Sequence, residues 1–498
     1  MLNKFSIRII LLVVVFSSLS SCKKWLDLQP QDGITGAEFW KTKEQVQASV
    51  VGCYASLLGG SRPLAELLLL WGELRADMVE ASTGTTNEEV DIINVNILPT
   101  NSICNWRTVY QTINYCNTVI DFAPGVLQKD PTFTQDALNK YLAEVKTIRA
   151  LMYFYLARTF GDVPLKLKAT SSDQEIVQLV KSPQQEVLTQ VLKDLAEAEP
   201  AAVLTYGNNP SDKGRITKYT VNAIQADVNL WMDKYDDCIT ACNKIISSNK
   251  FGLIDGSSSN TWFSTLYGNG NSNESIFEFQ FDNQKLNSFY PLMTTARRQL
   301  QVSGIVMDQI YGVDFIVPEN KDIRGDGAAV RSTDNTIWKY IGLNNTVGRA
   351  QEESYAHWIV YRYADILLMK AEALNQQGNH GQEALDIVYT IRNRARALSI
   401  TDNAPDQGDK LAVADFILQE RSREFAYEGK RWFDLLRNAK RNNYERLGLL
   451  LDVVATTVAP DRQQSAITKI RDKNSHYLPI FYYELQTDKL LVQNPFYR

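Results

Sequence analysis

The sequence predicts a mainly α-helical protein whose stacked helices carry long loops and a few short strands. First, apolar residues recur with helical spacing in both halves of the chain. Second, residues 358–374 are apolar almost all the way round a helix, which is typical of a helix inside a stack. Third, residues 255–356 between the helical blocks are rich in Gly, Asn, Ser and Thr.

The helical spacing and its stop signals together predict ten helices. Gly161 and Pro164 end the third helix, Gly378 separates two later ones, and Gly429 breaks the next junction. The predicted helices span residues 42–58, 106–122, 135–159, 183–197, 218–232, 235–247, 360–377, 382–397, 413–427 and 430–439.

Two adjacent helix pairs, 218–247 and 360–397, have the helix–turn–helix form of tetratricopeptide units. No clean 34-residue period runs through the chain, so any repeats are degenerate. Strand-like runs occur at 275–281 and 336–340, and a second loop-like segment covers 81–104. A scaffold of about 33–250 and 358–498 would therefore hold a loop-rich insertion of about 255–356, and such loops commonly carry binding sites.

Three charged residues lie on the apolar helix of the later block: Arg362, Asp365 and Glu372. Buried charges persist only when they are paired and hydrogen-bonded. Such charges could be acid/base groups, but we favour an interpretation in which they fix helix register. The candidate partners are Arg392, Arg394, Arg396, Arg421 and Arg423.

Several motifs resemble one family over most of the chain. They are RYADILLMKAEALN (362–375), ERSREFAYEGKRWFDLLR (420–437), AEVKTIRALMYFYLARTFGDVPL (143–165), GRITK (214–218), NESIFEFQFD (273–282) and the closing LPIFYYEL and QNPFY. This pattern is similar to that of the SusD/RagB family of bacterial outer-membrane lipoproteins. Phe481 departs from it, since the family often has a proline there. The resemblance implies four tetratricopeptide-like units, display on the cell surface and a SusC-like TonB-dependent transporter as partner.

The first thirty residues predict export. Lys4 and Arg8 precede an apolar run at 9–16 and small residues up to Cys22, as in a secretory signal. The run is too short to span a membrane. Leu-Ser-Ser-Cys resembles a bacterial lipobox, so we expect a signal peptide at 1–21, a lipidated Cys22, a tether at 22–32 and one domain at 33–498; the alternative is an ordinary signal with Cys22 as a bystander. Lys23 and Lys24 argue against retention at the inner membrane, and the family resemblance implies anchorage in the outer membrane.

Composition argues against several classes of function. The formal net charge is −5 and no basic stripe is present, so nucleic acid is not an expected partner. Five cysteines besides Cys22 leave at least one unpaired, and Cys238 and Cys242 are expected in the core. The three histidines are scattered, so no metal or cofactor is expected, although the sequence leaves a structural calcium open.

Catalysis is not expected, because no nucleophile elbow, metalloprotease motif or nucleotide-binding loop is present. A weaker possibility is a surface hydrolase that uses two carboxylates. The candidate carboxylates are Glu88, Glu89, Asp91, Glu274, Asp282, Asp314, Asp322, Asp326, Glu352 and Glu353.

The loops offer the chemistry that binds sugars, whose apolar face is covered by aromatic rings and whose hydroxyls bond polar side chains. Tyr290, with Arg297 and Arg298 nearby, is the first candidate for an exposed ring. The other candidate ligand contacts are Trp262, Tyr267, Tyr355, Asn87 and Asp91. The family resemblance implies that segment 81–104 contributes to the ligand site, but here the segment has no aromatic residue. This departure argues against a cradle for a starch-like helix and leaves open a more polar ligand, such as a branched glycan, an acidic sugar or a peptide.

We therefore expect a surface lipoprotein that captures an oligosaccharide, without catalysis, and passes it to the transporter that the family resemblance implies. The alternative is a tetratricopeptide-like scaffold that binds a peptide or a protein and no sugar.

Overall fold

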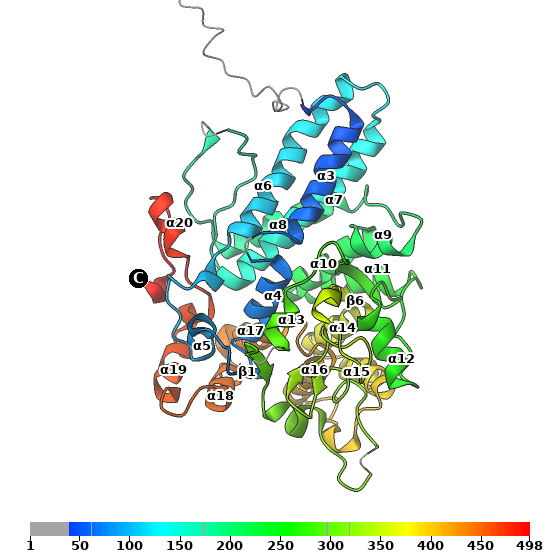
Figure 1. The fold of residues 1–498 in the computed structure, drawn as a ribbon, viewed down its shortest axis with the longest axis vertical. Helices are drawn as coiled ribbons and strands as arrows, with labels where there is room; N and C mark the ends of the chain where they lie inside the picture. The colour runs from blue at the N-terminus through cyan, green and yellow to red at the C-terminus, as the bar shows by residue number, and fades with distance from the viewer. Residues whose placement is uncertain (1–38, 61, 173–174, 295–296, 318) are drawn as a thin grey trace, which may run out of the picture.

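The computed structural model describes residues 39–60, 62–172, 175–294, 297–317 and 319–498 (Figure 1). The predicted signal peptide, tether and Cys22 lie outside the described residues. Helices dominate the rest and strands form three two-stranded sheets, which confirms the predicted fold class. Within the described ranges, no helix has both the length and the apolar character needed to cross a membrane.

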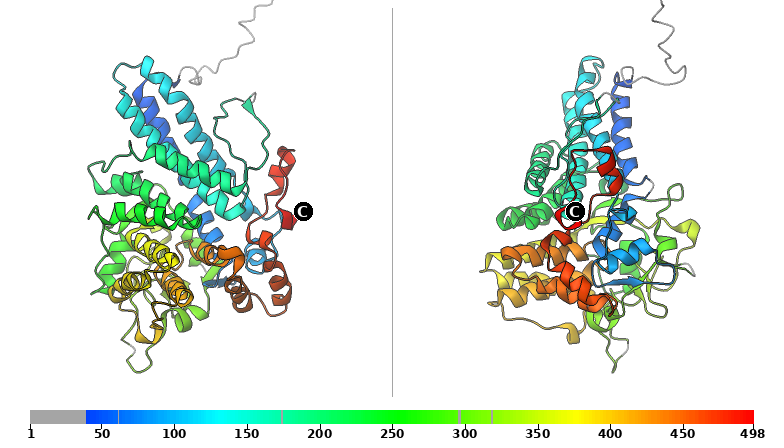
Figure 2. Two further views of the ribbon diagram at one scale, coloured as in Figure 1. Left: turned by 180° about the vertical axis from the view of Figure 1, so that it is seen from behind. Right: turned by 90° about the vertical axis from the view of Figure 1, so that its left-hand side faces the viewer.

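Four helices of the first half form an elongated stack at one end of the molecule (Figures 1 and 2). They are α3 (Lys43–Leu57), α6 (Arg107–Phe122), α7 (Gln135–Phe160) and α8 (Gln184–Ala198), and each packs on the next. Helix α3 begins with a capping box between Thr42 and Gln45, and Thr134 caps α7. All four were predicted to within two residues at each end.

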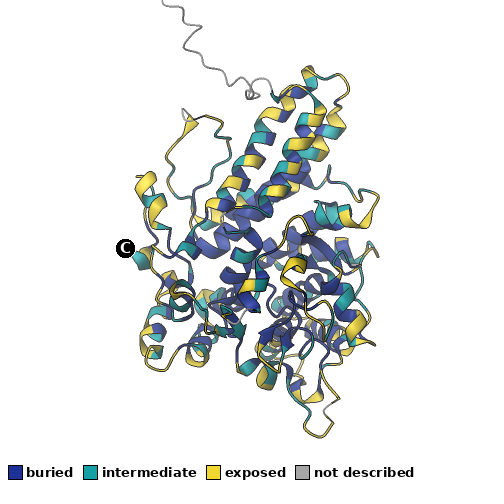
Figure 3. Ribbon diagram, viewed as in Figure 1, coloured by how far each residue is buried: buried dark blue, intermediate teal, exposed yellow. Residues whose placement is uncertain are grey.

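Six helices build the rest of the scaffold. They are α10 (Lys218–Trp231), α11 (Tyr235–Ile246), α14 (Tyr363–Gln377), α15 (Gly381–Ala395), α16 (Lys410–Glu424) and α17 (Arg431–Tyr444). The pairs α10–α11 and α14–α15 pack as predicted, and α11 also packs on α14, which joins the two pairs. Gly378, with φ of 89°, turns the chain between α14 and α15. Their buried residues (Figure 3) belong to two clusters, a large one that extends through most of the molecule and a smaller one between α14, α15 and α16.

The predicted start of the apolar helix at residue 360 is wrong. Residues Trp358–Arg362 form strand β6, which pairs antiparallel with β2 (Ser275–Phe279), and α14 begins only at Tyr363. Aromatic and β-branched residues, buried on both faces, favour a central strand there. The strand predicted at 275–281 is present in shortened form, and residues 336–340 contribute only β5 (Thr336–Ile337), which pairs with β4 (Val330–Arg331).

Several shorter elements were not predicted. The helices are α4 (Leu64–Glu73), α5 (Asn87–Ile93), α9 (Asn209–Gly214), α12 (Ser259–Phe263), α13 (Phe289–Met293), α18 (Gly448–Thr457), α19 (Gln463–Ile470) and α20 (Tyr482–Thr487). The strands are β1 (Val79–Ala81) and β3 (Leu300–Val302).

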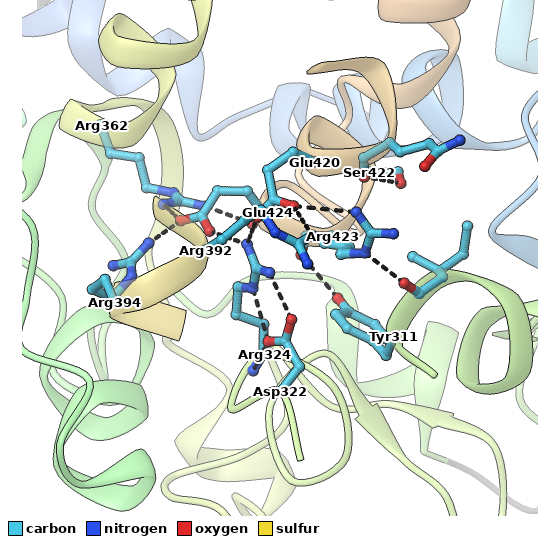
Figure 4. A network of polar contacts seen from close by, with 12 residues as sticks. Tyr311, Asp322, Arg324, Arg362, Arg392, Arg394, Glu420, Ser422, Arg423 and Glu424 are labelled. Atoms are coloured by element: carbon cyan, nitrogen blue, oxygen red, sulfur yellow. Dashed lines mark hydrogen bonds and ion pairs between the residues drawn. The ribbon is translucent and has the colours of Figure 1, made fainter. Parts of the chain in front are cut away.

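Paired charges in the interior support the structural interpretation of the charged residues. Arg362 donates to Glu274 at 2.7 Å and to Glu424 at 2.6 Å. Arg324 donates to Glu424 at 2.8 Å and to Glu420 at 2.6 Å (Figure 4). All five side chains are at most 2% exposed. This cluster, the buried ion network, joins α16 to β6 and to the loop-rich insertion.

The predicted pairing of the helix charges is correct in part. Asp365 pairs with Arg421 at 2.9 Å, as predicted, and also with Lys430 at 2.8 Å. Burial raises the pKa of Asp365, but the two cations outweigh it and hold that pKa at about 2. Glu372 instead pairs with Arg437 at 2.6 Å and with Arg441, both outside the predicted set.

The remaining candidate arginines have other partners. Arg392 and Arg423 pair with Glu420, and Arg394 pairs with Glu274 and Glu424. Arg396 donates to the backbone carbonyl of Ser257. The described cysteines are free and buried, so the expectation that Cys238 and Cys242 lie in the core is confirmed.

Candidate functional site

Strand pairing places segment 81–104 beside the segment that carries Tyr290. Strands β1 and β3 pair antiparallel, with Val79 opposite Val302 and Ala81 opposite Leu300. Helix α13, which carries Tyr290, packs on β3, and α5 packs on β1. These elements lie side by side in the lower half of the molecule (Figure 1). We call the area formed by residues 82–91 of the first segment and by residues 289–294 and 297–299 of the second the α5–α13 surface.

The two segments are locked together by backbone contacts. The amide of Gly84 donates to the carbonyl of Arg298 at 3.0 Å, and the hydroxyl of Thr85 donates to the carbonyl of Gln299 at 2.5 Å. A Cβ atom at Gly84 would lie 1.8 Å from the carbonyl oxygen of Arg297, so only glycine permits this approach. The surface therefore has a fixed base.

Helix α5 carries Asn87 and Asp91, and its N-terminus is capped. The Glu89 carboxylate accepts hydrogen bonds from the amide of Thr86 at 2.7 Å and from its hydroxyl at 2.9 Å, which completes a capping box. Burial raises the pKa of Glu89. Asn87 is exposed and Asp91 is half-buried, so both are accessible to a ligand. The Glu88 carboxylate accepts hydrogen bonds from the amide and the hydroxyl of Ser102. Like Glu89, it therefore stabilises the fold of this segment.

The two candidate arginines differ in their contacts. Arg298 donates to Ser82 at 3.3 Å, to Thr336 at 3.1 Å and to Gln301 at 2.9 Å, so it holds the loop in place. Arg297 is exposed, and its side chain makes no hydrogen bond or ion pair with any residue that the structure describes. Its guanidinium group is therefore available to a ligand.

Tyr290 and Tyr355 are half-buried and come from neighbouring segments. The carbonyl of Tyr290 accepts from the amide of Thr294 at 2.9 Å, which shapes the loop after α13. The Asn287 amide donates to the carbonyl of Ser354 at 2.7 Å, and the Asn287 side chain donates to that of Ala356 at 2.9 Å. These bonds hold Tyr355 in a segment beside the start of α13.

The other two candidate rings are buried core groups. Trp262 is 1% exposed, with the Arg394 guanidinium 5.5 Å from its ring centroid. Tyr267 is 3% exposed and donates to the Glu428 carboxylate at 3.0 Å. Both rings have polar neighbours in the sequence, which is typical of exposed side chains. In the structure, however, α12 and the helical turn at 264–268 that follows it direct both rings into the core. In this structure neither ring offers a face to a ligand.

Several of the loop carboxylates that could have formed a hydrolytic pair are engaged in other contacts. Glu274 belongs to the buried ion network, and Asp322 pairs with Arg324 of that network at 2.6 Å. Asp314 accepts from the amides of Ile316 and Val317, and these bonds lower its pKa. Among the described residues, no group of three or more His, Cys, Asp or Glu side chains is placed to hold a metal ion.

Exposed rings on α20 were not predicted from the sequence. Tyr483 on α20 is 44% exposed and lines a cavity with Trp106 and Tyr110. Trp106 is buried and Tyr110 is half-buried. The adjacent aromatic pair at positions 482 and 483 was the available signal.

Comparison with known families covers nearly the whole chain. Residues 264–497 match the model described as the SusD family. Residues 24–246 match the model described as starch-binding and associating with the outer membrane.

Relatives and solved structures agree with these matches. SusD-like protein P38 of Formosa agariphila is 28% identical over 481 residues, covering 86% of this chain and 90% of that protein. SusD-like protein P25 of the same organism is 25% identical and covers 98% of each chain. The crystal structure of a SusD superfamily protein from Bacteroides vulgatus superposes with a TM-score of 0.73 at 20% identity, over 92% of this chain and 100% of that one. The structural likeness shows the shared fold.

Proposed function

Because the chain belongs to the SusD/RagB family, we propose that it is a lipid-anchored surface protein that binds an oligosaccharide. It would pass this ligand to a SusC-like TonB-dependent transporter in the outer membrane. The observation that carries the proposal is the α5–α13 surface. Its accessible ring and polar groups lie on two segments that are hydrogen-bonded to each other.

The chemistry of this surface suits a sugar. The ring of Tyr290 can cover the apolar C–H face of a pyranose. The free guanidinium of Arg297 can donate to hydroxyl oxygens, and Asn87 and Asp91 can accept from hydroxyl groups. Because the loops are held by backbone contacts, these groups are positioned before the ligand arrives, which lowers the entropic cost of binding.

The protein would capture its ligand without chemical change. Several loop carboxylates that a hydrolase could use are engaged in ion pairs or helix caps, which supports binding alone. The lipid on Cys22 would hold the protein at the membrane, where it would close over the transporter as a lid. A stable contact of that kind needs a buried interface of well over ~1,000 Å².

Replacing Tyr290 with alanine is expected to weaken oligosaccharide binding about tenfold, because the stacking face is lost while the fold remains. A glycan array with the purified full-length protein would identify the ligand, and calorimetry would then compare the variant with the unmodified protein. Tyr389→Ala is a matched control, since Tyr389 is also half-buried but lies on α15. Unchanged affinity in Tyr290→Ala, or release of reducing ends from the glycan, would contradict the proposal.

A further inference from the structure

A second concave site lies away from the α5–α13 surface. A cavity of about 720 Å³ opens between α6, residues 166–170 and α20. Its volume falls in the range of ~300–1,000 Å³ that is common for small-molecule sites. Trp106 and Tyr110 form one wall, with ring centroids 5.3 Å apart in an edge-to-face arrangement. We call this cavity the α6–α20 pocket.

The floor of the α6–α20 pocket is fixed by two asparagines. The Asn114 side chain accepts from the amide of Thr170 at 2.8 Å and donates to its carbonyl at 3.2 Å. The Asn117 side chain donates to the carbonyl of Lys166 at 3.0 Å and to that of Lys168 at 3.2 Å. These bonds hold the loop against α6, so the pocket has a rigid base.

The rim of the pocket carries polar groups with unused bonding capacity. The Arg107 guanidinium lies 5.7 Å from the ring centroid of Tyr483. Arg107 and Glu484 form no ion pair within 4 Å, and the Arg107 side chain donates no hydrogen bond to any described residue. Gln111 uses its amide N–H to bond Tyr115, which leaves its carbonyl oxygen as an acceptor.

Glu484 is placed between the wall and the rim. Burial raises the pKa of its carboxyl, while a hydrogen bond from Trp106 and the charge of Arg107 act in the opposite direction. A carboxyl, a guanidinium and an amide oxygen therefore face one cavity together with the ring of Tyr483. Hydroxyl groups, which both donate and accept, match this mixture better than a purely cationic or anionic ligand does.

We propose that the α6–α20 pocket is a second carbohydrate site that takes one pyranose unit, stacked on Tyr483 and bonded by Arg107, Gln111 and Glu484. This inference rests on the proposed function, because it assigns a second contact to the same class of ligand. It adds a place of contact on the helical stack, outside the loop-rich insertion.

One segment of the chain connects the two sites. At one end of segment 81–104, Thr85 bonds the carbonyl of Gln299 beside the α5–α13 surface. At the other end, the carbonyl of Pro99 accepts from the amide of Tyr482 at 2.9 Å, beside the pocket. A glycan that reaches both sites would gain affinity from simultaneous contact, so binding is expected to strengthen with chain length.

The test is to replace Tyr483 with alanine and, separately, Glu484 with glutamine. The probes are α-glucan, β-glucan, β-mannan and xylan oligosaccharides of increasing length, measured by calorimetry and saturation-transfer NMR on full-length protein. Tyr483→Ala is expected to weaken binding of the longer oligosaccharides about tenfold. Tyr482→Ala is the matched control, because Tyr482 is 40% exposed on the same helix but does not line the pocket.

The outcomes separate this inference from the proposed function. One outcome would contradict the pocket assignment and leave the proposed function intact. In that outcome only Tyr290→Ala loses affinity for the oligosaccharide, while Tyr483→Ala and Glu484→Gln bind it as tightly as the unmodified protein does. If no oligosaccharide binds the unmodified protein, both fail. Displacement of the bound sugar from the pocket by a peptide, with tighter binding of that peptide, would also overturn the assignment. A crystal structure with sugar density over Tyr483 would support it directly.

Discussion

Replacing Glu424 with alanine is expected to lower the free energy of unfolding by roughly 3–5 kcal/mol, the usual cost of breaking a buried ion pair on one side. The Glu424 carboxylate accepts from Arg362 at 2.6 Å and from Arg324 at 2.8 Å, and it also pairs with Arg394. Burial raises its pKa, but the three guanidinium groups outweigh this and hold the pKa well below the usual value. Its removal would leave cations buried with too few carboxylates.

Urea denaturation followed by circular dichroism would measure this loss. Glu383→Ala is the control, because Glu383 is a helix carboxylate that is 49% exposed and pairs with Lys370 at 3.3 Å. An exposed pair of this kind contributes only about 0–1 kcal/mol. Equal losses in the two variants would show that the buried ion network does not stabilise the fold as its geometry indicates.

The buried ion network also links the scaffold to the candidate site. Arg362 ends β6, Glu424 ends α16, and Arg324 lies in the loop-rich insertion that also carries Tyr290. A loss of stability here should therefore loosen the insertion before the distant stack of α3, α6 and α7. Hydrogen exchange of the Glu424→Ala variant should show this order.

The sequence predicted the scaffold where periodicity and stop signals coincide. Helix α14 ends where Gly378 supplies a left-handed turn, and such a turn can be read from local sequence. The start of the same helix was predicted at the wrong residue, because a fully apolar run is compatible with a buried strand as well as with a buried helix. Only the pairing of β6 with β2, about 80 residues away, decides between them.

The candidate site was predictable by residue type but not by position. Tyr290 and Arg297 stood out because a ring and a cation share a polar context, and the structure leaves Tyr290 partly and Arg297 largely accessible. Trp262 had a similar context but faces the core. The contact that builds the surface joins Thr85 to Gln299, 214 residues apart, and no local pattern encodes it. The α6–α20 pocket was not predicted either, because it is also built from segments far apart in the sequence.

The second large effect is expected at Glu73, a fully buried carboxyl at the end of α4. Its Oε1 atom accepts from the amide of Gly429 at 2.8 Å, while its Oε2 atom has no hydrogen-bond partner among the described residues. A Cβ atom at Gly72 would lie 2.0 Å from the Gly429 carbonyl oxygen, so the two backbones are in close contact here. Burial, aided by the charge of Asp77, raises the pKa of Glu73 to about 8, although the Gly429 and Lys430 amides and Arg431 oppose it.

Glu73→Gln is therefore expected to stabilise the protein increasingly as pH rises from 4.5 to about 8. Below 4.5 the carboxyl is protonated in both states, and its contribution to stability is fully present. Above 4.5 the unfolded chain releases the proton while the folded chain retains it, so the free energy of unfolding falls by roughly 1.4 kcal/mol per pH unit until the folded pKa is reached. Glutamine cannot ionise and removes this loss, whereas Glu73→Asp retains a carboxyl and should keep the slope. Urea denaturation of all three proteins across this pH range would measure it, and parallel pH profiles for glutamine and the unmodified protein would show that Glu73 ionises without cost in the folded state.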